Sequence, residues 1–175
     1  AAAPAGDVDA AGPDGMAALD PSGAVRCGES RNVGDGGPPP VGPDGTVYLC
    51  RSEDMARTGP RLPFFDGTVA ALERLGRKAR ILSKEVAGQD GSLPKGLSDV
   101  IGAVLGVAGF TWKDCGSTLL PGAIVEHLTS FGADFSHAGQ TKLTEALRGG
   151  AAGSSGTVAE PLNYWNKFPV PSLHV

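Results

Sequence analysis

Two short β-forming runs enclose one amphipathic stretch, and this arrangement is the strongest constraint on the fold. The first run, TVYLC at Thr46–Cys50, is β-branched and aromatic and follows a Pro-Asp-Gly turn, which is typical of a strand. A helix is predicted after Pro63, because apolar residues then recur at i, i+4, i+7 and i+10 before Gly76, a residue type that commonly ends helices. A second strand is predicted at 78–83. This order predicts a β-α-β unit with a right-handed crossover.

The first 44 residues differ sharply in composition from the rest of the chain. Glycine, proline, aspartate and serine dominate, and the turn-forming sequence GPDG occurs at 12–15 and again at 42–45. So few apolar residues cannot offset the conformational entropy that ordering this segment would cost. The sequence therefore predicts a Gly/Pro-rich extended arm at 1–44, followed by an α/β domain at 45–175.

Three further segments extend the predicted domain. The apolar run at 99–110 has no polar face, which fits either a strand covered on both sides or a buried helix, and we favour the strand. Alternation at 122–132 favours another strand over a helix. A helix is predicted at 140–148, with Thr141 as its cap and Gly149 at its end. The expected fold is α/β, with a mostly parallel, Rossmann-like sheet and flanking helices.

The stretch GGAAGSSGTVAEP at 149–161 looks like a phosphate-binding loop, but its position argues against that role. Such loops lead from a strand into a helix N-terminus, where free backbone N–H groups meet the anion. Here the predicted helix precedes the glycines, and a strand is expected to start at Thr157. The stretch also matches neither GxGxxG nor GxxxxGK[ST]. Its small residues instead indicate a tight helix-to-strand connection.

Charge and hydropathy narrow the classes of partner. The net charge is −4, and the basic residues are scattered apart from a cluster at 74–80, which argues against nucleic acid as the partner. No apolar run reaches the roughly 18–20 residues of a transmembrane helix. The small-residue start AAAPAG suits a terminus left by cleavage of a signal peptide, so an exported location is expected. No metal or cofactor motif is present, and a protein is the expected partner.

The three cysteines, Cys27, Cys50 and Cys115, lack the CxxC spacings of zinc and redox sites. A disulfide between Cys27 and Cys50 would close the Gly/Pro-rich stretch and reduce the entropy of the unfolded chain. Three unpaired, partly buried thiols are an equally weighted alternative.

Roughly three quarters of the chain, from Gly45 onward, resembles an uncharacterised family of bacterial exported proteins. The architecture of that family is similar to the caspase/gingipain class of α/β cysteine peptidases. The resemblance implies that the chain is cut short at Val175, because members of the family continue further. It implies a fold and no named activity. The segments that carry it are VYLCRSEDMAR (47–57), PFFDGTVAALERLGRKARIL (63–82), LPGAIVEHLTSFGADF (120–135), GQTKLTEALRGGAAGSSGTVAEP (139–161) and KFPVPSLHV (167–175).

Peptidases of that class need a His-Gly pair after one strand and a Cys at the end of the next, so that imidazole and thiolate meet above the sheet. This chain contains no His-Gly pair, and Ser130 stands where the resemblance would place the Cys. The catalytic hypothesis is therefore a diverged hydrolase that uses Cys115 or Ser130 with His127, or Cys115 with His137. The competing role for His127 is that of a structural, half-buried strand residue.

Two carboxylates, Glu126 and Glu160, lie in or at the end of predicted strands. The carboxyl ends of strands are where open α/β sheets bind ligands, so both are candidate site residues. Structural ion pairs with Arg148 or Lys142 are the favoured role.

An aromatic segment near the C-terminus is the other candidate surface. Tyr164, Trp165 and Phe168 are interleaved with prolines and follow Glu160. Proline pre-orders the backbone and aromatic rings supply large contact areas at low entropic cost, which is how binding hot spots are built. The favoured function is a non-catalytic binding or assembly module of an exported bacterial protein. It would contact its partners through the N-terminal arm and this aromatic segment.

Overall fold

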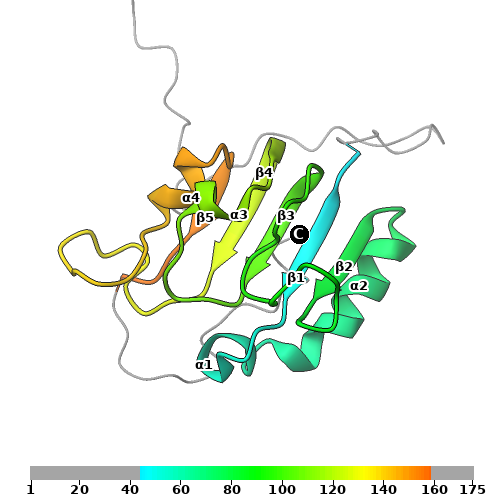
Figure 1. The fold of residues 1–175 in the computed structure, drawn as a ribbon, viewed down its shortest axis with the longest axis horizontal. Coiled ribbons are helices and arrows are strands. Elements are labelled where there is room, and N and C mark those ends of the chain that lie inside the picture. Colours follow the sequence, from blue (N-terminus) through cyan, green and yellow to red (C-terminus); the bar gives the residue numbers. More distant parts are fainter. Residues whose placement is uncertain (1–43, 159–175) are drawn as a thin grey trace, which may run out of the picture. The chain divides into compact units, whose positions relative to one another are not determined.

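The computed structural model describes residues 44–158, which form a five-stranded parallel sheet with helices on both faces (Figure 1). The strands are β1 (Thr46–Cys50), β2 (Lys78–Leu82), β3 (Val100–Leu105), β4 (Leu119–His127) and β5 (Gly153–Ser155). The helices are α1 (Met55–Thr58), η1 (Leu62–Phe64), α2 (Phe65–Arg74), α3 (Trp112–Cys115) and α4 (Thr144–Arg148). The strand order is β2-β1-β3-β4-β5, and all neighbours run parallel. The predicted α/β fold with a parallel sheet is confirmed.

The predicted β-α-β unit is present as β1, α2 and β2. All five residues of β1 are buried, because β1 has a neighbouring strand on each side and covered faces above and below. Gly76 follows α2 with a φ of +70°, a left-handed conformation that glycine adopts without strain. The short helices α1 and η1 lie between β1 and α2, where the sequence shows no helical periodicity.

The core has two parts, one on each face of the sheet. Side chains alternate along β1, so Val47 and Leu49 pack with α2 residues such as Phe65 on one face. Tyr48 and Cys50 belong to the cluster on the other face. That cluster also includes residues of α3 and α4. Figure 1 shows α2 beside β2, and α3 and α4 beside β4 and β5.

The strand predicted at 122–132 exists, but its bounds differ. β4 begins earlier, at Leu119, and ends at His127, so residues 128–132 belong to the following loop. The alternation of apolar and polar residues that suggested a longer strand therefore continues past the end of pairing with β3.

The helix predicted at 140–148 is shorter, since α4 covers only Thr144–Arg148. Thr141 does not cap it. Its hydroxyl accepts a hydrogen bond from the Phe110 N–H at 2.9 Å and donates one to the Phe110 carbonyl at 3.0 Å. The Thr141 side chain therefore makes a tertiary contact with Phe110, and it does not form the local helix cap that the sequence predicted. The predicted end of the helix at Arg148 is correct.

The strand that follows the glycines is β5, inside the glycine-rich stretch, and not at Thr157 as predicted. Tight packing explains two of the four glycines in this stretch, since a Cβ atom on Gly150 or Gly153 would meet nothing within 4 Å. A Cβ atom on Gly149 would lie 2.6 Å from Cγ of Trp112, and one on Gly156 would lie 2.7 Å from the carbonyl carbon of Gly132. The connection between α4 and β5 is therefore a tight turn, as its composition indicated, with Gly149 packed on Trp112 and Gly150 at a φ of +104°.

Within residues 44–158, no helix is long and apolar enough to cross a bilayer.

Candidate functional site

The strand order marks one place where ligands bind in open α/β sheets. The chain leaves β1 for β2 on one side and then crosses to β3 on the other, so the connections diverge between β1 and β3. In such sheets the crevice beyond the carboxyl ends of the two diverging strands is the usual ligand site. The residues at this crevice are therefore the first candidates for function.

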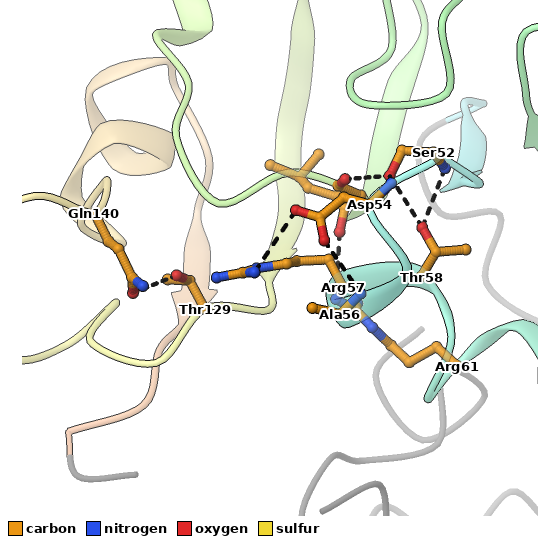
Figure 2. A network of polar contacts seen from close by, with 10 residues as sticks. Ser52, Asp54, Ala56, Arg57, Thr58, Arg61, Thr129 and Gln140 are labelled. Carbon is orange, nitrogen blue, oxygen red and sulfur yellow. Dashed lines mark hydrogen bonds and ion pairs between the residues drawn. The ribbon is translucent and has the colours of Figure 1, made fainter. Parts of the chain in front are cut away.

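Ser52, two residues after β1, joins the loops at the carboxyl ends of β1 and β3. Its hydroxyl donates to the carbonyl of Gly106 at 2.5 Å and accepts from the N–H of Asp54 at 3.1 Å. The Thr58 hydroxyl in α1 lies 3.1 Å from both the Ser52 N and the Ser52 Oγ, and it is buried. Figure 2 shows Ser52, Asp54 and Thr58 in this network. Every group in it is bonded to another part of the chain.

The connection from β2 to β3 fills the crevice. The Gly106 N–H donates to the Ser92 carbonyl at 3.0 Å, which draws the 91–92 backbone onto the ends of β1 and β3. A Cβ atom on Gly91 would lie 2.0 Å from the Arg51 carbonyl oxygen, and one on Gly106 would lie 2.9 Å from the Cys50 carbonyl oxygen. The ligand position between β1 and β3 is thus occupied by backbone of the chain itself.

A buried ion pair lies on the other side of this crevice. Arg61 is 2% exposed and Glu126 is 8% exposed, and the guanidinium contacts the carboxylate directly. The guanidinium also donates to the carbonyl of Leu105, the last residue of β3, at 3.3 Å. Burial lowers the pKa of Arg61, and the charge of Glu126 opposes that shift. The pair therefore ties the segment after α1 to the ends of β3 and β4.

The predicted partners of Glu126 are wrong. Arg148 pairs with Glu145 within α4 at 3.8 Å, and Lys142 donates to the Phe131 carbonyl at 2.8 Å. Both lie on the loop and helix after β4, whereas the cation that reaches Glu126 comes from the opposite half of the sheet.

His127, the last residue of β4, is 2% exposed and packs edge-on against the Phe110 ring at 4.9 Å between centroids. Neither imidazole nitrogen makes a hydrogen bond of good geometry within the described residues, although backbone groups of Val107 and Ala108 lie nearby. Burial lowers the pKa of His127 from 6.5 to about 4. The carbonyls of Val107 and Ala108 oppose this shift, and the nearby cation of Arg61 adds to it. The imidazole is therefore neutral at neutral pH and shielded from solvent.

The structure does not bring Cys115 to His127. Cys115 lies in α3, where its thiol donates to the Trp112 carbonyl at 2.9 Å and its own carbonyl accepts from Gly96. Gly96 belongs to the segment that leads into β3, so Cys115 lies toward the amino-terminal ends of the strands. His127 lies at their carboxyl ends.

Ser130 and His137 lie in the loop after β4, which is held by its own polar contacts. The Gln140 carbonyl oxygen accepts from the Thr129 hydroxyl and from the Phe131 N–H, the latter at 3.0 Å. The ring of His137 stacks on that of Phe131 at 3.7 Å. Ser130 is half-buried in this loop, three residues beyond His127.

Several predicted site residues lie outside the described residues. These are Glu160, Tyr164, Trp165, Phe168 and the disulfide candidate Cys27. The predicted partner of Cys27, Cys50, is a buried free thiol in β1, and burial raises its pKa.

Two grooves lie near the β2 side of the sheet. The first, of about 520 Å³, lies beyond the ends of β1 and β2. Among its charged residues, Lys84 pairs with Glu53 and Asp90 pairs with Lys95. The second, of about 620 Å³, is lined by residues of α2, of β2 and of the segment at 86–97. We call it the β2-edge groove.

Within residues 44–158, no group of three or more His, Cys, Asp or Glu side chains is arranged to hold a metal ion. Comparison of the chain with family models, curated proteins and solved structures gives no match.

Proposed function

We propose that the chain is a non-catalytic protein-binding module. The filled crevice between β1 and β3 is the observation that carries this proposal. Backbone at 91–92, the Ser52 network and the Arg61–Glu126 pair take up the position where an α/β enzyme would hold its substrate.

The chemistry of the candidate catalytic groups supports the same proposal. A general base near neutral pH needs a pKa close to the working pH and access to the proton that it takes. His127 has a pKa of about 4, is buried, and packs against a phenyl ring. Cys115 lies toward the other end of the strands, with its thiol bonded to a carbonyl. The diverged-hydrolase alternative then depends on Ser130 alone.

A protein is the favoured ligand because the described domain keeps a free strand edge with a groove beside it and several exposed large apolar side chains. Met55, Phe135 and Val158 are all at least 60% exposed. These side chains add exposed apolar surface, but the free edge of β2 and the groove beside it are the features that favour a protein ligand. The N-terminal arm and the aromatic segment after Glu160 remain predicted contact regions of the same module, and the exported location belongs to the same proposal.

Covalent labelling of nucleophilic side chains distinguishes the non-catalytic binding module from the hydrolase alternative. The full chain is treated with a fluorophosphonate and with iodoacetamide, beside the variants Ser130→Ala, Cys115→Ala and His127→Gln, and labelled sites are mapped by mass spectrometry. We expect no fluorophosphonate adduct at Ser130 and a rate of thiol alkylation that does not depend on His127. An adduct at Ser130 that disappears in folded His127→Gln would overturn the non-catalytic assignment.

A further inference from the structure

The outer edge of β2 carries backbone groups that no strand pairs with in the part of the chain that the structure describes. β2 is the first strand of the sheet order and pairs only with β1. The Leu82 carbonyl accepts from the Arg51 N–H at 2.7 Å, so Leu82 and the residues two and four before it direct their backbone groups toward β1. Ala79 and Ile81 therefore direct their N–H and C=O groups outward. Such an edge is a template for pairing with another extended chain.

The β2-edge groove runs along this free edge. One wall is α2, with Val69 and Ala70. The other wall includes Val86 and Leu97, and Leu97 packs against the core cluster on the face opposite α2. Residues from both faces of the sheet line this groove, and β2 is the edge strand. The groove must therefore pass around the outer side of β2. It has room for side chains above and below an added strand.

The charges of the groove are separated by face. Asp66 and Glu73 are exposed on the α2 wall, and neither has an ion-pair partner in residues 44–158. Arg80 lies on the opposite face, in register with Tyr48, and is also exposed. An occupant with basic side chains toward α2 would therefore neutralise two carboxylates. An acidic or polar side chain on its other face would suit Arg80.

The spacing of the carboxylates sets the spacing of the basic residues in the occupant. Asp66 and Glu73 are seven residues apart on a helix, which corresponds to about 10.5 Å along its axis. Residues four apart in an extended chain are about 13 Å apart and share a face. Long lysine or arginine side chains can span the difference. Val69, between the two carboxylates, would then meet an apolar residue midway between the basic ones.

We propose that the β2 edge binds an extended segment of a partner protein by strand addition, with two basic residues four positions apart and an apolar residue midway between them. Main-chain hydrogen bonds to Ala79 and Ile81 would supply affinity, and the alternate side chains would supply selectivity. This inference rests on the proposed function, because it names the partner chemistry and the surface of a protein-binding module.

Selection from a displayed library tests the pattern. Random peptides of about 10 residues, the upper length of an ordinary strand, are selected on the immobilised full chain. We expect enriched peptides to share the basic, apolar, basic spacing. A synthetic copy of an enriched peptide is then made in two forms, N-methylated either at its odd or at its even residues. Strand addition requires one form to lose binding by at least tenfold while the other keeps it, since only alternate N–H groups face β2.

Charge reversal tests the location. The double variant Asp66→Lys with Glu73→Lys should weaken peptide binding by at least tenfold. The matched control, Asp114→Lys with Asp134→Lys, changes the net charge equally at one exposed and one half-buried position away from the groove, and it should leave binding unchanged. Ile81→Pro, which removes an outward N–H from an edge strand, should also abolish binding. Circular dichroism and thermal melting confirm that each variant is folded.

Several outcomes overturn the inference. Failure to enrich peptides with this spacing, equal effects of the two N-methylated forms, or binding that survives charge reversal would each do so. Dimerisation of the chain alone that depends on Ile81 would mean that a second copy occupies the edge, which also overturns it. If a peptide binds but its affinity is unchanged by the β2-edge variants, the strand-addition inference is wrong and the proposed protein-binding function is retained. A His127-dependent adduct at Ser130 removes that function independently.

Discussion

Arg61 and Glu126 form a buried ion pair that joins two halves of the sheet. Arg61 follows α1 on the β1 side, and Glu126 is the penultimate residue of β4. Both side chains are almost completely buried, at 3% and 10% side-chain exposure. A buried charge is tolerated only with a partner, because its removal from water costs several kcal/mol. The pair therefore fixes how the segment after β1 closes over the ends of β3 and β4.

Removing one member of this pair should destabilise the fold strongly. Glu126→Leu leaves the Arg61 guanidinium buried without its carboxylate, and we expect a loss of about 3–5 kcal/mol in the free energy of unfolding. Adding Arg61→Met should restore most of that loss, because two apolar side chains then fill the same space. Urea denaturation of the single and double variants measures both steps.

The matched control for this prediction is an exposed pair. Lys84 and Glu53 have side chains that are 64% and 79% exposed, so Lys84→Met should leave the denaturation midpoint almost unchanged. If Glu126→Leu is as mild as Lys84→Met, or if the double variant is no better than the single one, the Arg61–Glu126 contact is not what holds this part of the fold.

The free energy of unfolding should fall as the pH is lowered between the pKa values of His127 in the unfolded and folded states. Its pKa is 6.5 in an unfolded chain and about 4 in the folded one. Between these values the unfolded state binds the proton and the folded state does not, so stability rises with pH up to about 6.5. The full difference corresponds to roughly 3 kcal/mol. Denaturation with urea at a series of pH values measures this slope.

His127→Gln is the informative comparison, since glutamine is polar and does not titrate. The variant should lose most of the pH dependence between about 6.5 and 4, whatever its absolute stability. Asp90, whose pKa is held at about 2 by hydrogen bonds with Lys95 and Ser92 in spite of its partial burial, contributes only at lower pH. An unchanged slope in His127→Gln would show that the imidazole titrates normally in the folded protein.

The backbone that fills the crevice should tolerate no side chain at Gly91. Its φ is +77°, and a Cβ atom would lie 2.0 Å from the Arg51 carbonyl oxygen, so Gly91→Ala must push the 91–92 backbone off the ends of β1 and β3. We expect a loss of more than about 3 kcal/mol in the free energy of unfolding. Gly96 has a φ of +65° with open space around it, so Gly96→Ala isolates the conformational cost, at about 1–2 kcal/mol. Equal effects in thermal melting would mean that the crevice is not closely packed.

The elements that the sequence predicted well are those with local signals. β1 and α2 carry β-branched and amphipathic patterns that need no distant partner to be recognised. β5 contains only glycine and serine, so its strand conformation comes from pairing with β4, where Ile124 faces Gly153 and Glu126 faces Ser155. Local propensity gives no sign of such a strand.

The polar cluster at the carboxyl ends could be predicted only in part. Glu126 lies among apolar residues of a strand, so its side chain is expected to be buried. A buried carboxylate is rarely found without a cationic partner. Nothing in a single sequence identifies Arg61 as that cation, because it lies 65 positions away in a segment without periodicity. The sequence also did not predict that backbone fills the crevice. The glycines that allow this close approach, Gly91 and Gly106, look like ordinary turn residues in a single sequence.

Thiol accessibility should confirm that Cys50 and Cys115 are buried. Cys50 and Cys115 are both buried, and burial raises the pKa of Cys50, so little of its reactive thiolate forms at neutral pH. We expect iodoacetamide to leave both unmodified in the native chain and to alkylate both after denaturation in guanidinium. Peptide mapping by mass spectrometry assigns the modified residues. The same experiment without reductant checks that Cys50 is a free thiol, because a Cys50 bridged to Cys27 would stay unmodified in denaturant while Cys115 reacts. Rapid alkylation of Cys115 in the native chain would contradict its burial and would reopen its candidacy as a nucleophile.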